Sequence, residues 1–149
     1  VCFVGGEETW LEEEKKIISA ANGWQRVERK GTLPLIEVES LIANASALLF
    51  PSLYEGFGLP VLEALQLGVP VLACRTSSIP EITGDGYPLA DPTNPISYLH
   101  TLHTLLKDRD YWIAYGRERG KLFSSQKMVS ALLTNYEKRL QSCDLALSQ

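Results

Sequence analysis

Two carboxylates and two glycines lie close together in the segment Pro51 to Ala64, which reads PSLYEGFGLPVLEA. Glu55 and Glu63 are the carboxylates, and Gly56 and Gly58 lie between them. Glycine has no β-carbon, so it adopts positive φ angles and lets a ligand approach the backbone closely. An ionised carboxylate accepts hydrogen bonds from donors such as the hydroxyls of a sugar. The pattern therefore predicts a loop that binds an anionic, hydroxyl-rich ligand.

The residues on either side predict the elements that position this loop. The apolar run Ala47 to Phe50 indicates a strand covered on both faces inside a parallel sheet. Pro60 suits the first turn of a helix, so we expect a helix to begin near Leu59. Its first free amides, expected near Val61 and Leu62, and the positive end of its dipole favour a phosphate.

Glu63 is expected just inside the opening turn of this helix. There the helix dipole favours the ionised carboxylate, which then accepts hydrogen bonds from a diol such as that of a ribose. The acid of a glycosidase pair needs a raised pKa instead, so a glycosidase is disfavoured.

Apolar strand-like runs alternate with helical patterns along the chain, which predicts an α/β fold. We expect a Rossmann-like parallel sheet with helices on both faces, and a single domain over residues 1–149. The segment from Ala47 to Cys74 has the size of one βαβ unit. The expected strands are Val1–Val4, Gln25–Glu28, Ala47–Phe50 and Val69–Ala73. The expected helices run from about Glu7 to Asn22, Leu35 to Ile42, Pro60 to Leu67, Leu99 to Leu106, Tyr111 to Lys121 and Val129 to Leu140.

Four loops follow the carboxyl ends of these strands, where open parallel sheets bind ligands. They are Gly5–Thr9, Arg29–Pro34, Ser52–Leu59 and Arg75–Glu81. We expect them to converge on one edge of the sheet.

Composition narrows the class of protein. Apolar residues make up 45% and charged residues 21% of 149, and no apolar run is long enough to span a membrane. A net charge of −4 disfavours a nucleic-acid partner, and membrane contact is not indicated. Cys2, Cys74 and Cys143 lack the spacing of a metal site or a disulfide framework, so we expect reduced thiols and a cytoplasmic protein. The chain starts without Met inside a predicted strand, which indicates a fragment.

The spacing of Glu55 and Glu63, with Gly-Phe-Gly-Leu-Pro between them, resembles the retaining glycosyltransferases of family GT4, which have the two-domain GT-B fold. The resemblance extends through residues 68–92 and the helices after them. It implies that this chain is the C-terminal, donor-binding half. It also implies that an N-terminal acceptor domain, and an Arg and a Lys that neutralise the diphosphate, lie upstream of Val1.

The same resemblance implies roles for particular residues. Glu55 would contact the transferred sugar as the catalytic residue, and Glu63 would bind the ribose. The loop Arg29–Pro34 would pack on the nucleotide base, and Arg75–Glu81 would lie near the sugar and phosphates. Relatives often have Gly-Gly where this chain has Ser77-Ser78. Residues expected at the sugar and diphosphate are Gly56, Phe57, Gly58 and Leu59, and candidates in the base and phosphate loops are Gly5, Lys30, Gly31, Thr32, Arg75 and Glu81.

The implied reaction transfers a hexosyl unit, with retention, from a UDP- or GDP-sugar to a glycan or lipid acceptor, in polysaccharide biosynthesis. The nucleotide sugar would be a substrate, and neither a cofactor nor a metal is expected. An alternative is a non-catalytic nucleotide-sugar-binding or assembly module. A nucleotide-sugar epimerase of related fold fits the Glu-to-Glu spacing less well.

Overall fold

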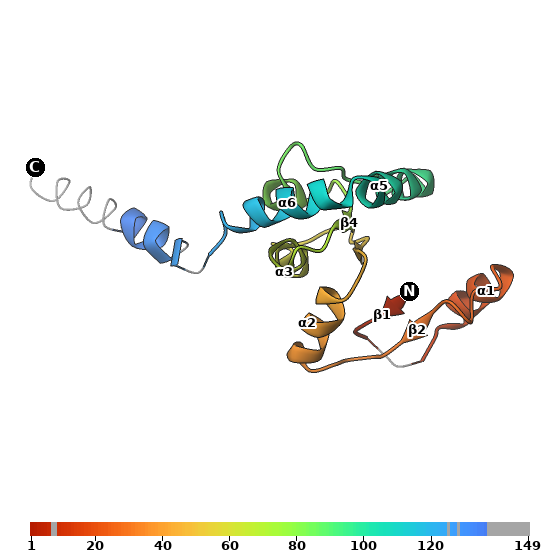
Figure 1. Ribbon diagram of the computed structural model, residues 1–149. Helices are drawn as coiled ribbons and strands as arrows, with labels where there is room; N and C mark the ends of the chain where they lie inside the picture. The colour runs from red at the N-terminus through yellow and green to blue at the C-terminus, as the bar shows by residue number, and fades with distance from the viewer. Residues whose placement is uncertain (7–8, 125, 128, 137–149) are drawn as a thin grey trace, which may run out of the picture. The chain divides into compact units, whose positions relative to one another are not determined.

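Parallel strands alternate with helices in this computed structural model, which describes residues 1–6, 9–124, 126–127 and 129–136 (Figure 1). The chain divides into two units, Val1–Asn44 and Ala45–Gln149. Within the described residues, each unit contains one pair of parallel strands. The expected α/β architecture with parallel strands is confirmed, and the single domain over 1–149 stays a prediction.

The first unit pairs β1 (Cys2–Phe3) with β2 (Glu28–Arg29) in parallel, with Cys2 opposite Glu28. Its helices are α1 (Glu12–Ala20) and α2 (Leu35–Ala43). The strand predicted near Gln25–Glu28 is present as β2, which begins at Glu28, the last residue of the predicted range. A turn occupies the residues before it, where the amide of Arg26 donates to the carbonyl of Gly23 at 2.8 Å.

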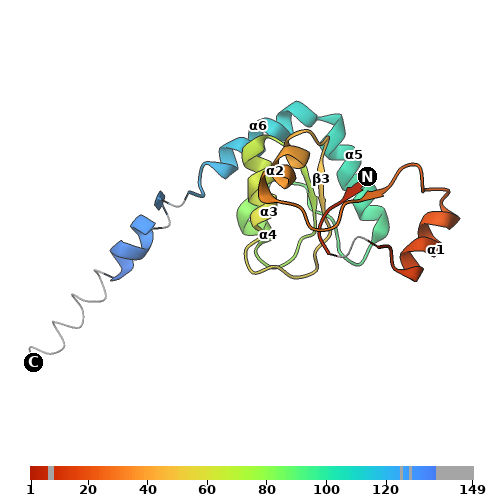
Figure 2. The ribbon, with the colours of Figure 1, turned by 90° about the horizontal axis from the view of Figure 1, so that it is seen from below.

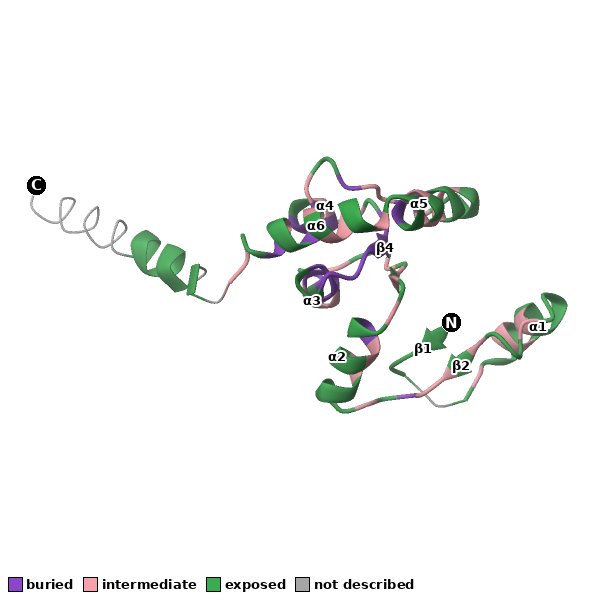
Figure 3. Ribbon diagram, viewed as in Figure 1, coloured by how far each residue is buried: buried purple, intermediate pink, exposed green. Residues whose placement is uncertain are grey.

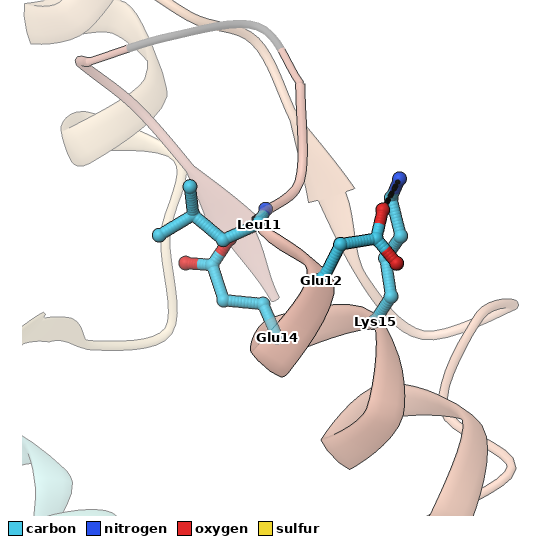
Figure 4. A network of polar contacts seen from close by, with 4 residues as sticks. All are labelled: Leu11, Glu12, Glu14 and Lys15. Carbon is cyan, nitrogen blue, oxygen red and sulfur yellow. Dashed lines mark hydrogen bonds and ion pairs between the residues drawn. The ribbon is translucent and has the colours of Figure 1, made fainter.

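Helix α1 begins at Glu12, later than the expected start near Glu7 (Figure 4). The amide of Leu11 donates to Oε2 of Glu14 at 2.8 Å, so a side chain satisfies a backbone donor that the helix start leaves free. Lys15 pairs with Glu12 at 2.7 Å on the surface of the same turn. Residues 7 and 8 lie outside the described part of the chain, as do Leu140 and Cys143.

Aromatic side chains on either side of α1 pack against one another and against the strand pair of the first unit. The ring of Trp10 lies edge-on to those of Phe3 and Trp24, with centroids 5.1 and 6.1 Å apart. The guanidinium of Arg29 lies 4.3 Å from the Trp10 ring and pairs with Glu14 at 2.7 Å. A cation over an aromatic face adds electrostatic attraction to the packing.

The second unit contains the predicted βαβ unit: β3 (Leu48–Phe50), α3 (Leu59–Leu67) and β4 (Val71–Ala73). The two strands are parallel, with Leu49 opposite Leu72. Gly68, at φ +79°, ends α3 as the sequence predicted. The helices that follow are α4 (Ile79–Thr83), α5 (Pro95–Lys107) and α6 (Arg109–Gly120), and residues 129–136 are also helical.

Buried residues gather on α3 and β4 (Figure 3). Val61, Leu65 and Val71 are almost fully buried there. The buried Tyr87 hydroxyl accepts a hydrogen bond from the amide of Val71 at 2.7 Å, and burial raises the pKa of Tyr87 to about 12. The core therefore fixes α3, the helix that leads out of the glycine loop.

Helix α6 packs closely on α3, as Figures 1 and 2 show. Gly116 and Gly120 face α3, and a β-carbon at Gly120 would lie 2.6 Å from Cγ of Gln66. The side-chain amide of Gln66 donates to the carbonyls of Gly120 at 3.1 Å and Phe123 at 3.2 Å. Small residues and these bonds hold the two helices together. Among the described residues, no helix is long and apolar enough to cross a membrane.

Candidate functional site

The glycine loop runs from the end of β3 to α3, which begins at Leu59 as predicted. Gly58 is the N-cap of α3 and has φ +93°. A β-carbon at Gly58 would lie 2.8 Å from Cδ1 of Ile79 and 3.4 Å from Cδ1 of Ile82. Glycine is required here both for its backbone conformation and for the close packing on α4.

The expectation that the amides of Val61 and Leu62 are free is wrong. Both donate to the carbonyl of Gly58, at 3.0 and 3.2 Å, because the left-handed Gly58 places that carbonyl under the first turn. Within the part of the chain that the structure describes, the backbone amides of residues 55–59 donate to no protein atom. The donors available to an anion therefore lie in the loop and at Leu59, one turn earlier than expected.

The two carboxylates lie on this loop and on α3. Glu55 is in the loop and Glu63 is on the helix, and both are half-buried. The first turn of α3 contains no acidic residue, so the placement of Glu63 in the opening turn is wrong. It lies one residue beyond that turn, where the dipole acts on it more weakly.

A cavity of about 770 Å³ opens beside Glu63. Phe57 and Leu59 line it from the loop and α3, and Phe123 and Lys127 line it from the stretch after α6. The rings of Phe57 and Phe123 meet edge to face, with centroids 6.1 Å apart. The sequence interpretation assigned no binding role to Phe123 or Lys127. An aromatic residue just beyond a predicted helix end was the available signal.

The loop after β4 lies against the glycine loop. The hydroxyl of Ser77 donates to the carbonyl of Glu55 at 2.8 Å. Arg75 is exposed, and its amide donates to Ala90. Glu81 is exposed on α4. The structure thus brings two predicted loops together, and the phosphate contacts of Arg75 and Glu81 stay predictions.

The candidates of the first unit lie in two loops that also meet. The amide of Gly5 donates to the carbonyl of Gly31 at 2.6 Å, and both glycines have positive φ. The hydroxyl of Thr32 lies 3.5 Å from the carbonyl of Gly6. Lys30 pairs with Glu28 at 2.7 Å, and this hydrogen bond and the charge of Glu28 raise the pKa of Lys30. The convergence of all four loops stays a prediction.

A family model described as glycosyl transferases group 1 matches residues 1–119, most of the chain. The chain belongs to this family. The O-antigen chain mannosyltransferase B of Escherichia coli is 36% identical over 127 residues, which are 76% of this chain and 33% of that protein. The MMP alpha-(1->4)-mannosyltransferase of Mycolicibacterium hassiacum is 32% identical over 111 residues, 70% of this chain and 27% of that protein. The chain thus spans about a third of the length of the curated relatives that it matches.

Solved glycosyltransferase structures share the fold of this family member. Sucrose-phosphate synthase from Thermosynechococcus elongatus matches with a TM-score of 0.76 at 20% identity, over 95% of this chain and 38% of its own. HepE of Anabaena, solved in complex with UDP-glucose, matches with a TM-score of 0.73 at 21% identity, over 95% of this chain and 40% of its own. The expected GT-B glycosyltransferase fold is confirmed, and the assignment to its C-terminal half stays a prediction.

Proposed function

We propose that this glycosyltransferase chain binds the nucleotide-sugar donor and serves transfer of a hexosyl unit, with retention, to a glycan or lipid acceptor. The observation that carries the proposal is the row of amides at residues 55–59 with no protein acceptor, next to the carboxylate of Glu55. Unpaired amides at a helix start bind phosphate oxygens, and the carboxylate accepts hydrogen bonds from sugar hydroxyls.

In the proposed reaction, the bond between the sugar C1 and the β-phosphate oxygen breaks, and the acceptor hydroxyl oxygen bonds to C1 on the same face. The electron pair of the broken bond passes to the leaving diphosphate, which also takes up the proton that the acceptor hydroxyl loses. The amides of the loop and of Leu59 stabilise the negative charge that develops there, which is how preorganised donors lower a barrier. Glu55 orients the sugar, and Glu63 holds the ribose from α3.

The donor in this proposal is a UDP- or GDP-sugar. The solved neighbour HepE was crystallised with UDP-glucose, and two of the relatives above are named mannosyltransferases. The name of the O-antigen relative supports an acceptor in polysaccharide biosynthesis, and we place the reaction in the cytoplasm. The nucleotide sugar is a substrate in this proposal, since the reaction consumes it, and not a resident cofactor.

NMR tests where the donor binds. The ¹⁵N-labelled chain is titrated with UDP-glucose and with GDP-mannose, and we expect saturable shifts of the amide signals of residues 55–59 with one of them. Shifts confined to other residues, or none with either donor, would refute the proposed site.

The stereochemistry is tested in the full-length protein by following slow donor hydrolysis by proton NMR. Retention predicts that the α-linked donor first releases the α-anomer, and Glu55→Gln should slow the release by at least tenfold. Release of the β-anomer would contradict retention. Donor binding without hydrolysis or transfer would favour the non-catalytic binding module instead.

A further inference from the structure

Three consecutive hydroxyl side chains after β4 donate to carbonyl groups of the glycine loop. We call Thr76, Ser77 and Ser78 the hydroxyl clamp. The pairs are Thr76 Oγ1 with the carbonyl of Ser52 at 3.2 Å, Ser77 Oγ with that of Glu55 at 2.8 Å and Ser78 Oγ with that of Phe57 at 2.8 Å.

Successive clamp residues contact carbonyls successively later in the glycine loop, at positions 52, 55 and 57. Ile79, the next residue after the clamp, is the one against which Gly58 packs. The Ser78 hydroxyl also lies 3.3 Å from the carbonyl of Glu55, but it carries one proton, and the shorter contact is to Phe57. The carbonyls of Ser52, Glu55 and Phe57 thus each have their own hydroxyl donor.

Ser77 and Ser78 differ from typical residues at their positions, in backbone conformation and in helix capping respectively. Ser77 has φ +52°, a left-handed conformation that is unfavourable for a residue with a β-carbon. Ser78 is the N-cap of α4, yet its side chain makes no capping hydrogen bond. Serine at this position usually accepts a bond from a helix amide, so the hydroxyl is committed to the loop instead.

The clamp holds the loop by its carbonyls and leaves its amides unpaired. The amides of Glu55, Gly56 and Phe57 donate to no atom of the described residues. A loop with glycines at positions 56 and 58 samples many conformations unless it is restrained. Restraint in the bound conformation removes part of the ordering cost of binding.

We propose that the hydroxyl clamp positions the amides of residues 55–57 for the diphosphate of the donor. Its members are positioning residues, since they act through the loop backbone. The inference rests on the proposed function and adds the residues that set the geometry of that site.

The test uses Ser77→Gly and Ser78→Ala together in the full chain. Glycine at 77 keeps the left-handed conformation without strain while it removes the hydroxyl, so the fold should tolerate it. The matched control is Thr104→Ala, which removes a hydroxyl bond of the same kind, 3.0 Å from the carbonyl of His100, within α5.

Two measurements distinguish positioning from general stability. ¹⁵N relaxation should show backbone order parameters of residues 55–58 falling from about 0.85 to below about 0.6 in the double variant. Calorimetry should show the Kd for UDP or GDP rising roughly 5- to 10-fold, from lost restraint. The Tm should stay within about 3 °C, and the control should change neither quantity.

Each outcome decides between the two claims. If the unaltered chain binds UDP or GDP and the double variant binds equally well, the clamp is refuted while the proposed function stands. Unchanged order parameters of residues 55–58 in the double variant would also refute the positioning role of the clamp, whatever the Kd. If the unaltered chain binds neither nucleotide, the proposed function fails and the inference falls with it.

Discussion

Gly58→Ala tests whether the left-handed start of α3 and its packing on α4 shape the donor loop. At φ +93° a residue with a β-carbon loses about 1–2 kcal/mol. The new methyl would lie 2.8 Å from Cδ1 of Ile79, and overpacking of this kind costs about 1–3 kcal/mol. Alanine also lowers the conformational entropy of the unfolded chain, which offsets about 0.4–1 kcal/mol of this loss. The expected net loss in the free energy of unfolding is about 1–5 kcal/mol.

Urea denaturation of the chain measures this loss, with Gly56→Ala as the matched control. A β-carbon at Gly56 would have no atom within 4 Å, so the control should lose less than about 0.5 kcal/mol. Ile79→Val removes the clashing Cδ1, and adding it to Gly58→Ala should recover about 1 kcal/mol relative to the sum of the single changes. Equal losses for Gly58→Ala and Gly56→Ala would refute the reasoning.

Three further predictions concern the framework of the second unit. Tyr87→Phe removes the acceptor of the buried Val71 amide and should cost about 1–3 kcal/mol in urea denaturation at pH 8. Burial raises the pKa of Tyr87 to about 12, so as the pH rises the unfolded chain loses the phenol proton at a lower pH than the folded chain does. The free energy of unfolding should therefore fall by about 3 kcal/mol between about pH 10 and pH 12. The same pH series on Tyr87→Phe should lack that part of the loss, and equal slopes would contradict the assignment. Gly120→Ala places a methyl 2.6 Å from Cγ of Gln66 and should lower the Tm by several degrees. An unchanged Tm would show that α6 can shift on α3 to make room for the methyl. Arg119→Gln removes guanidinium hydrogen bonds of 3.1 and 2.6 Å to two carbonyls of α4. Urea denaturation should show a loss of about 1–2 kcal/mol in the free energy of unfolding. No loss would mean that water replaces these hydrogen bonds.

The βαβ unit was predictable because its signals are local. The apolar run before Phe50, Pro60 in the first turn and Gly68 after the last turn each act within a few residues, and the bounds of α3 follow from them. The start of β2 was not predictable from the sequence. A turn at Gly23 lies between α1 and β2, and the amide of Gly23 donates to the carbonyl of Ile18 in α1. Sequence periodicity contains no information on such a bond.

The residues of the site stay predictions, and their detailed geometry could not be predicted from the sequence. The spacing of Glu55 and Glu63 singled out both carboxylates as candidates. The positive φ of Gly58 moved the free amides to the loop, and Ile79, which is distant in sequence, packs where a β-carbon of residue 58 would lie. The hydroxyl clamp depends likewise on how the loop after β4 lies against the loop after β3. Such tertiary contacts have no short-range signal in the sequence.

The most direct test of the central claim is calorimetric titration of the chain with UDP, GDP and ADP, repeated on Glu63→Gln. We expect saturable binding of UDP or GDP at one site, weakened roughly 10- to 100-fold in the variant by loss of a charged hydrogen bond. The Tm of the variant should be unchanged, because Glu63 is half-buried and lines the cavity rather than the core. Equal binding by both proteins, or no binding of either UDP or GDP, would contradict a nucleotide-sugar site at this loop.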